Sequence, residues 1–288
     1  MNKSTNQSTT GAQRGTILVI GAGGKTGRRV LARLDAAGMQ ARPASRSAET
    51  RFDWNDRSTW RPALAGVEAA YLTFAPDLAF PGADETVGAF AELAVAQGVR
   101  RLVLLSGRGE AGARSAEQRL QASGADWTIV RCAFFNQNFS ETFLDTIRAG
   151  TLSLPGGDTA EPFVDAEDIA DVVFAALTDD RHIGHLYELT GPRLLTLDEV
   201  ASELSEALGR PVHYRPVTAS AYATELMGLG LPGDTASALA GLIAEVLDGR
   251  NAFVTDGVER ALGRAPRDFS QYVRQTAERG AWASREAA

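Results

Sequence analysis

The stretch Thr16-Ile-Leu-Val-Ile-Gly-Ala-Gly-Gly-Lys-Thr-Gly27 decides the fold of this chain. Its first five residues form a short apolar run, rich in β-branched side chains, that ends at a glycine, which is typical of a buried parallel strand. Over residues 25–37 the apolar side chains then recur at helical spacing, and Gly38 stands where a C-terminal glycine is expected. The stretch therefore predicts a strand, a glycine-rich turn and an amphipathic helix.

Strands and helices continue to alternate as far as residue 131. Apolar runs and their glycine boundaries predict helices at 86–97 and 115–123 and strands at 40–45, 51–53, 68–74, 101–105 and 127–131. Because right-handed crossovers place helices on both faces of a parallel sheet, this order predicts an α/β fold built on a doubly wound parallel Rossmann sheet.

Helical patterns dominate after residue 150. We expect extended segments at 186–189 and 212–214, and helices at 165–177, 197–208, 219–228, 235–248 and 256–278. We therefore divide the chain into a disordered tail at 1–14, a Rossmann domain at 15–150 and a smaller, mainly helical C-terminal lobe at 151–288. The chain of this lobe is expected to return in part to the sheet.

The composition of the 288-residue chain argues against several classes of protein. A formal net charge of −7 gives no basic field to neutralise a phosphate backbone, so nucleic acid is not an expected partner. Cys132 is the single cysteine, which excludes an intramolecular disulfide and a zinc site built on several thiolates. No stretch offers the roughly 18 apolar residues needed to span a bilayer. We expect a cytoplasmic protein, bound to no membrane, whose partner is a small molecule.

The glycine-rich turn matches the spacing GxxGxxG at Gly21, Gly24 and Gly27. The first glycine permits a tight turn, the second lets the backbone approach a pyrophosphate, and the third packs the helix against the strand. Because helix N-terminal amides then face the phosphates, the turn predicts a dinucleotide site that also includes Gly23, Lys25 and Thr26. The alternatives are a structural turn without ligand and a P-loop; the latter fails because Val19 stands where its first glycine is required.

The end of the second strand favours NADP(H) over NAD(H). An acidic side chain there would accept hydrogen bonds from the ribose 2′-hydroxyl, but the sequence is Ala44-Ser-Arg-Ser47. Arg46 is instead placed to bind a 2′-phosphate, with Ser45, Ser47 or Lys25 in support, unless it is a solvated surface arginine. Asp53, with Trp54 beside it, could accept a hydrogen bond from the adenine amino group or serve as a turn carboxylate.

The chain resembles the NmrA-like branch of the atypical short-chain dehydrogenases, and within it the group related to ergot-alkaloid reductases and NAD(P)H:quinone oxidoreductases. Besides the turn, the resemblance rests on residues 51–54, Trp127-Thr-Ile-Val-Arg131, Phe134-Phe-Asn-Gln-Asn-Phe139, residues 99–106 and residues 162–170. It covers nearly the whole chain after the tail. It implies a Rossmann domain that binds NADP(H), with substrate held between the cofactor and the C-terminal lobe.

The proton donor common in short-chain dehydrogenases is absent from this sequence. That donor is a Tyr-x-x-x-Lys pair in which lysine lowers the tyrosine pKa. Lys3 and Lys25 are the only lysines, and no tyrosine has a lysine four residues later. We expect a reductase of this kind to use an acceptor that needs little proton assistance, such as a quinone, an iminium ion or an activated enone, or else another donor.

Further site candidates follow the carboxyl ends of strands, where open parallel sheets bind ligands. Thr73, Phe74 and Ala75 are expected to pass the nicotinamide ribose. Ser106 is the candidate catalytic residue and a cofactor contact, either as a hydrogen-bond donor to a substrate carbonyl or as a loop serine that caps backbone amides. The resemblance implies a nicotinamide and substrate wall, for which plain core is the alternative, at Phe134, Phe135, Asn136, Asn138 and Phe139.

Other polar residues have structural interpretations. Asp165 and Asp168 precede a predicted helix and are expected to cap its amides and complement its dipole. His182 and His185 have no evident third ligand, so we interpret them as solvated histidines and expect no metal. Cys132 is interpreted as a small core residue. The apolar faces of the helices at 84–97 and 115–123 could support a homodimer or pack on the sheet.

These observations favour an NADPH-dependent oxidoreductase that transfers hydride to a small conjugated, quinone or iminium substrate. Two alternatives stay open. One is a regulatory protein that senses NADP(H) without turning it over, and the other is an isomerase or epimerase that retains the dinucleotide. The wider family includes all three kinds of protein.

Overall fold

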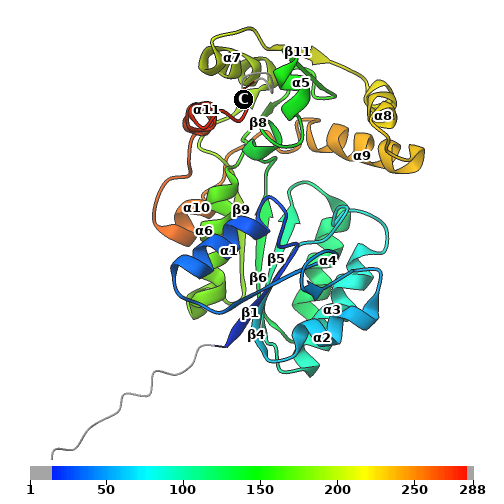
Figure 1. The fold of residues 1–288 in the computed structure, drawn as a ribbon, viewed down its shortest axis with the longest axis vertical. Helices are drawn as coiled ribbons and strands as arrows, with labels where there is room; N and C mark the ends of the chain where they lie inside the picture. The colour runs from blue at the N-terminus through cyan, green and yellow to red at the C-terminus, as the bar shows by residue number, and fades with distance from the viewer. Residues whose placement is uncertain (1–14, 284–288) are drawn as a thin grey trace, which may run out of the picture.

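Seven parallel strands form the centre of the lower body in the computed structural model, which describes residues 15–283 (Figure 1). Their order across the sheet is β3 (Thr50–Arg51), β2 (Ala41–Ser45), β1 (Thr16–Ile20), β4 (Val67–Leu72), β5 (Arg101–Gly107), β6 (Asp126–Cys132) and β9 (His185–Leu189). The strand order reverses between β1 and β4, and ligands bind beside such a switch point in open parallel sheets. The predicted doubly wound Rossmann sheet is therefore confirmed.

The central strand β1 is buried on both faces, which explains why its sequence is continuously apolar. All five of its residues are buried. Ile17 and Val19 pack into the core on one side of the sheet, whereas Leu18 and Ile20 pack into the core on the other side. A polar side chain at any of these positions would face an apolar layer.

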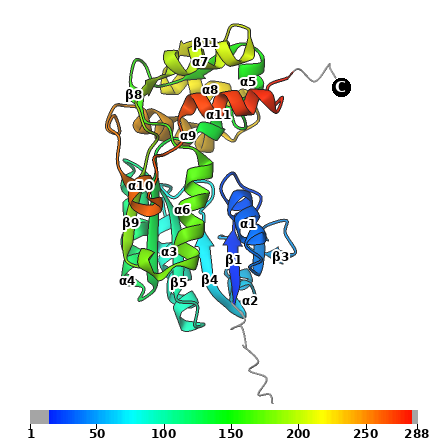
Figure 2. The ribbon, with the colours of Figure 1, turned by 90° about the vertical axis from the view of Figure 1, so that its left-hand side faces the viewer.

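Two layers of helices cover the sheet (Figures 1 and 2). One face carries α1 (Gly27–Ala36), α6 (Ala166–Thr178) and α10 (Gly257–Leu262). The other face carries α2 (Trp60–Leu64), α3 (Ala83–Ala96) and α4 (Ala111–Ala122). The apolar faces of α3 and α4, which include Phe90 and Leu120, are buried in this second layer, so they pack within the protomer.

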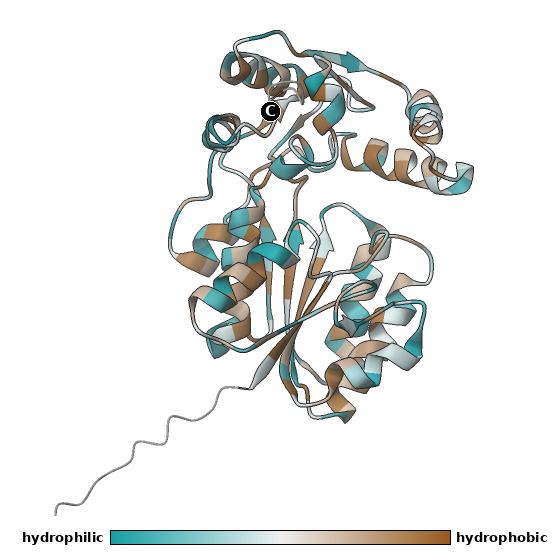
Figure 3. Ribbon diagram, viewed as in Figure 1, coloured by the Kyte–Doolittle hydropathy of each residue, from teal (hydrophilic) through white to brown (hydrophobic). Residues whose placement is uncertain are grey.

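The upper body is a lobe with its own apolar core (Figure 3). Its helices are α5 (Leu144–Arg148), α7 (Leu197–Leu208), α8 (Ala219–Gly228), α9 (Gly233–Val246) and α11 (Phe269–Glu278). Two short strand pairs complete it, β7 (Thr151–Leu154) with β11 (His213–Pro216), and β8 (Ala160–Glu161) with β10 (Leu195–Thr196). Outside these elements of the lobe, the described residues form 3₁₀ turns at Arg57–Thr59 and Asp180–His182 in the sheet body and at Asn136–Asn138 in the segment after β6.

The chain after residue 150 builds both bodies. It follows α5, the first helix of the lobe, with β7 and β8, then supplies α6 and β9 to the sheet body, and later supplies α10. The single helix expected at 256–278 is two helices, α10 and α11, because Gly263 takes a left-handed φ of 69° and Pro266 follows. The elements that periodicity missed, such as β8 and α5, are too short to show a period.

Two expectations concern membrane spans and the N-terminal tail. None of the helices within residues 15–283 combines the length and the apolar character needed to cross a membrane. The expected tail at 1–14 lies outside the described residues.

Buried ion pairs attach the C-terminal segment to α6. Asp165 caps this helix as expected, since its Oδ1 accepts a hydrogen bond from the Glu167 amide at 2.8 Å. Asp168 is fully buried and does more than complement the helix dipole. Its carboxylate accepts a hydrogen bond from the Arg267 amide at 2.7 Å and pairs with the guanidinium groups of Arg264 and Arg267.

Substituting Asp168→Ala should lower the free energy of unfolding by about 2–3 kcal/mol, because it removes the fully buried carboxylate that binds the Arg267 amide and two guanidinium groups, although both arginines keep their pairs with Asp171. Chemical denaturation measures this change. The control is Asp145→Ala, whose side chain is 93% exposed and pairs with Arg148 at 3.5 Å. That control should shift stability by less than about 0.5 kcal/mol, and an equal effect of both substitutions would contradict the structural role of Asp168.

Candidate functional site

The glycine-rich turn joins β1 to α1 at the switch point of the sheet. Gly21 has a φ of 72°, a left-handed conformation that favours glycine. Its amide donates to the carbonyl of Ala44 at 3.0 Å, and its own carbonyl accepts from the Gly24 amide at 2.8 Å. The turn is thus attached to the end of β2, and α1 begins directly after it at Gly27.

The glycines of the turn differ in the space that a Cβ atom would have. A Cβ at Gly27 would lie 2.2 Å from the carbonyl oxygen of Gly21, and a Cβ at Gly21 would lie 2.1 Å from Oγ1 of Thr73. A Cβ at Gly23 would meet nothing within 4 Å. The protein itself requires Gly21 and Gly27, whereas a Cβ at Gly24, the second glycine of the motif, would lie 3.1 Å from the carbonyl oxygen of Gly21. Open space at a glycine of this turn, as at Gly23, is what the close approach of a pyrophosphate requires. These residues fit a dinucleotide.

Side chains behind the turn hold it in place. Tyr71, fully buried on β4, donates its hydroxyl proton to Oγ1 of Thr26 at 2.9 Å, and Thr73 donates to the carbonyl of Ile20 at 3.0 Å. Lys25 reaches toward the lobe, where its Nζ donates to Oγ1 of Thr142 at 2.9 Å. Burial lowers the pKa of Lys25. Tyr71 was missed by sequence reasoning, since a tyrosine inside an apolar strand is typical of plain core.

Arg46 lies exposed just after the carboxyl end of β2. Within residues 15–283 it forms no ion pair, so its guanidinium is free to bind an anion at this end of the site. Oγ of Ser45 accepts a hydrogen bond from the Ala48 amide at 3.0 Å, which shapes the turn that presents Arg46. The structure thus places Arg46 and Ser45 together at the expected edge of the sheet.

Asp53 and Trp54 both make contacts within the protein. Oδ1 of Asp53 accepts a hydrogen bond from the Asn55 amide at 3.0 Å, as a turn carboxylate does. Trp54 is buried, and its indole N–H donates to the carbonyl of Thr73 at 2.9 Å. Its ring packs against Phe74 at a centroid distance of 5.1 Å. Trp54 therefore binds and packs against the loop after β4. Ala75 is exposed on that loop.

A cavity of about 400 Å³ lies between the carboxyl ends of the strands and the lobe. It begins at the glycine-rich turn, where Lys25 forms part of its wall. The sheet body further contributes Phe74, Leu105, Ser106 and Cys132, the segment after β6 contributes Phe134, Phe135 and Asn138, and the lobe contributes Tyr222, Leu226, Leu239, Leu242, Ile243 and Val246. The wall is mostly apolar, as small-molecule sites usually are.

The structure divides the five residues expected to form the substrate wall. Phe134, Phe135 and Asn138 line the cavity. Phe139 is fully buried in the core of the lobe, with its ring centroid 5.5 Å from that of Phe269. Asn136 is also fully buried and does not line the cavity. Sequence adjacency could not separate these positions, because the 3₁₀ turn at Asn136–Asn138 directs neighbouring side chains to different sides.

Ser106 lines the cavity, but its hydroxyl proton is engaged. Its Oγ donates to Oε1 of Glu117 at 2.6 Å, and Glu117 also accepts a hydrogen bond from Nε of Arg131 at 2.9 Å. Among the described residues the serine caps no backbone amide, and its hydroxyl proton is directed to Glu117. Glu117, buried on α4, was missed by sequence reasoning.

Glu110 is a further cavity residue that the sequence analysis did not identify. It directly precedes α4, and its side chain is only 8% exposed. Burial raises the pKa of its carboxyl to about 8, and repulsion from Asp77, Glu245 and Glu117 adds to the shift. No sequence signal could have identified it, because a glutamate beside glycine and arginine is typical of a solvated loop.

One of the two histidines is buried, contrary to the expectation, and the cysteine is buried as expected. His182 is buried rather than solvated, and its Nδ1 lies 2.9 Å from the hydroxyl of Tyr187, whereas His185 is exposed. Cys132 is buried as expected, and burial raises the pKa of its thiol. Residues 15–283 contain no cluster of three or more His, Cys, Asp or Glu side chains that could hold a metal ion.

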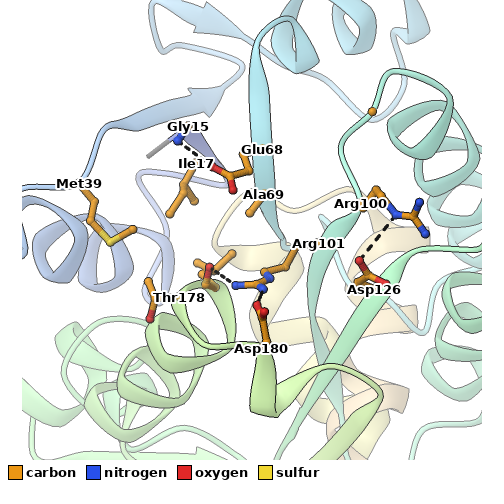
Figure 4. A pocket seen from close by; sticks show the side chains of 12 residues that line it. Gly15, Ile17, Met39, Glu68, Ala69, Arg100, Arg101, Asp126, Thr178 and Asp180 are labelled. Atoms are coloured by element: carbon orange, nitrogen blue, oxygen red, sulfur yellow. Dashed lines mark hydrogen bonds and ion pairs between the residues drawn. The ribbon is translucent and has the colours of Figure 1, made fainter. Parts of the chain in front are cut away.

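A second cavity, of about 440 Å³, lies at the opposite edge of the sheet, at the amino ends of the strands (Figure 4). Its charged groups are engaged within the protein: Glu68 accepts a hydrogen bond from the Gly15 amide at 2.7 Å, Arg100 pairs with Asp126 at 3.7 Å, and Arg101 pairs with Asp180. Open parallel sheets bind their ligands at the carboxyl ends of the strands. The cavity beside the glycine-rich turn is therefore the candidate site.

Comparison with known proteins agrees with this geometry. A family model described as NAD(P)H-binding matches residues 21–180, and one described as the NmrA-like family matches residues 114–273. Agroclavine dehydrogenase of Claviceps fusiformis is 32% identical, covering 90% of this chain and 96% of that relative. NAD(P)H azoreductase of Xenophilus azovorans is 30% identical, with the same two coverages. The NADPH complex of quinone oxidoreductase QOR2 from Escherichia coli shares the fold, with a TM-score of 0.73 at 20% identity over 91% of this chain and 99% of that one.

Substituting Gly23→Ala should weaken NAD(P)H binding about tenfold, roughly 1.4 kcal/mol, because the new methyl group would occupy the side of the turn that faces the pyrophosphate. Fluorescence titration measures the affinity. The midpoint of thermal unfolding should stay unchanged, since the methyl group meets no protein atom. Gly27→Ala is the contrasting variant and should lower that midpoint. Unchanged affinity in Gly23→Ala would mean that the pyrophosphate lies elsewhere.

Proposed function

This chain belongs to the NmrA-like family of NAD(P)H-binding proteins, and we propose that it is an NADPH-dependent oxidoreductase that transfers hydride to a small conjugated, quinone or iminium substrate. The observation that carries the proposal is one continuous cavity with two ends. Its wall includes Lys25 of the glycine-rich turn together with Leu239 and Ile243 of the lobe, so the two ends are the turn and the lobe. A nicotinamide and an acceptor held in this cavity would lie against each other.

The turn and the end of β2 are the proposed cofactor site. The backbone of residues 21–27 would hold the pyrophosphate at the N-terminus of α1, and Arg46 would bind the 2′-phosphate that distinguishes NADPH from NADH. The loop of Thr73, Phe74 and Ala75 would pass the nicotinamide ribose. When bound, the cofactor supplies the hydride. Asp53 and Trp54 remain proposed contacts of the adenine end.

The cavity wall supports a flat, conjugated substrate. Phe74 from the sheet body, Phe134 from the segment after β6 and Leu226 from the lobe present apolar surface, which packs on aromatic rings and excludes water. The names of two relatives, an agroclavine dehydrogenase and an NAD(P)H azoreductase, also support redox chemistry. Orientation of such a substrate against the cofactor could supply much of the rate.

Arg46→Ala should weaken NADPH binding by about 10- to 100-fold, since a charge-assisted hydrogen bond to phosphate contributes about 1.5–3 kcal/mol. NADH affinity should stay the same because NADH lacks the 2′-phosphate. Paired fluorescence titrations with the two nucleotides measure this. Arg274→Ala, on the exposed face of α11, is the matched control and should alter neither affinity. Equal losses for NADPH and NADH would contradict the assignment of Arg46.

The purified protein should oxidise NADPH in the presence of at least one member of a panel of quinones, enones and iminium ions, followed by the loss of cofactor absorbance. Tight NADPH binding without oxidation by any acceptor would contradict the oxidoreductase and favour a cofactor-sensing protein. Copurification of a dinucleotide that is not consumed would favour an isomerase or epimerase.

A further inference from the structure

Glu110 places a carboxyl group in the wall of the proposed substrate cavity. Its Oε2 is buried and has no hydrogen-bond partner among the described residues. A Cβ built on Gly107, at the carboxyl end of β5, would lie 2.1 Å from this oxygen, so the carboxyl rests directly on the end of that strand. Ser106 precedes Gly107 on the same strand and lines the same cavity. The carboxyl therefore lies at the strand ends where a Rossmann site performs its chemistry.

The groups around Glu110 keep its carboxyl neutral. Asp77 on the loop after β4, Glu117 on α4 and Glu245 on α9 face it with negative charge. The guanidinium of the neighbouring Arg108 is engaged elsewhere, with Nε donating to Glu188 at 2.7 Å. Lys25 and the Cys132 thiol share the cavity wall, and the Lys25 ammonium is bound to Thr142. Burial and these carboxylates raise the pKa of Glu110 to about 8, so at neutral pH it carries a proton.

Other proton donors in the cavity are weaker or engaged. The Ser106 hydroxyl already donates to Glu117 at 2.6 Å. Burial raises the pKa of Tyr222 to about 12 and raises that of the Cys132 thiol, which makes both groups weak acids near neutrality. Burial raises the pKa of Asp77, but its carboxylate is engaged, since it accepts a hydrogen bond from the Ala79 amide at 2.8 Å that opposes this shift.

We propose that Glu110 is the general acid of the site and protonates the acceptor as hydride reaches it. This assignment rests on the proposed oxidoreductase function. Reduction of a quinone consumes one hydride and one proton: the O–H bond of Glu110 breaks as an O–H bond forms on the quinone oxygen, and water reprotonates the carboxylate. Reduction of a cationic acceptor needs hydride alone and gives a neutral product. Glu110 therefore takes the place of the Tyr-x-x-x-Lys pair that this sequence lacks.

The test compares two acceptors in wild-type protein and in Glu110→Gln. One acceptor is 1,4-naphthoquinone, which needs a proton, and the other is N-methylacridinium, which needs none. Glu110→Gln should lower kcat for the quinone by about 10²- to 10⁴-fold, the usual contribution of a general acid. It should leave kcat for N-methylacridinium largely unchanged. Tyr222→Phe should separate the two acceptors much less, because the tyrosine is not the donor.

Glu161→Gln is the matched control. Glu161 is also a buried carboxyl whose pKa burial raises to about 8, but it does not line the cavity. This variant should not distinguish the quinone from N-methylacridinium. Equal losses on both acceptors in Glu110→Gln, or no loss on either, would overturn the general-acid assignment. Absence of turnover by the wild-type protein with both acceptors would overturn the proposed function itself.

Two further measurements test the proposal without the Glu110→Gln variant, which could fold poorly. In wild-type protein, kcat for the quinone should fall about tenfold per pH unit above pH 8, since only the neutral carboxyl donates, while kcat for N-methylacridinium should not follow that decline. Infrared difference spectra of Glu161→Gln, which lacks the other buried carboxyl whose pKa burial raises to about 8, should still show a carboxylic acid band that disappears near pH 8. A carboxylate band of Glu110 already present at pH 6 would overturn the proposal.

Discussion

The close approach of α1 to the end of β1 is the constraint on which the rest of the structure depends. The carbonyl oxygen of Gly21 lies where a Cβ at Gly27 would intrude to 2.2 Å, so the helix can start at this point only on a glycine. This approach aims the N-terminus of α1 across the carboxyl end of the sheet. It also lets the Gly21 amide bind β2 and places Thr26 under the Tyr71 hydroxyl. The backbone amides available to a phosphate follow from this single packing requirement.

The lobe completes the site because the chain crosses repeatedly between the two bodies. Asp168 on α6 binds Arg267, and the same segment leads into α11 in the core of the lobe. A second crossing is held by Arg108, whose buried guanidinium binds the Asn251 carbonyl at 3.0 Å and lies 4.2 Å from the ring centroid of Phe253. Buried charges of this kind are costly to leave unpaired, so they specify how the lobe attaches to the sheet. The cavity wall is correspondingly shared by both bodies.

The cavity joins apolar surface to a small set of polar groups with different proton affinities. Ser106, Glu117 and Arg131 form a satisfied network at the end of β5 and β6. Glu110 lies four residues after Ser106, and its buried Oε2 has no hydrogen-bond partner among residues 15–283. The same low-polarity surroundings that would exclude water from an acceptor therefore keep this carboxyl protonated. One physical cause, burial, prepares both the binding surface and the acid.

The doubly wound parallel sheet, the glycine-rich turn and the resemblance to the NmrA-like family could all be predicted from the sequence, because they rest on local periodicity, on glycines that sterics require and on short motifs. The sequence could not place Asn136 and Phe139 apart from Phe134, nor show His182 buried or Ser106 bound to Glu117, since these depend on contacts between residues distant in the chain. Glu110 shows the difference most clearly. Its position in the chain indicates a solvated loop, but the folded chain surrounds it with α9, the loop after β4 and the end of β5. Tertiary structure alone decided its protonation, because desolvation is a property of the space around a residue and not of its neighbours in sequence.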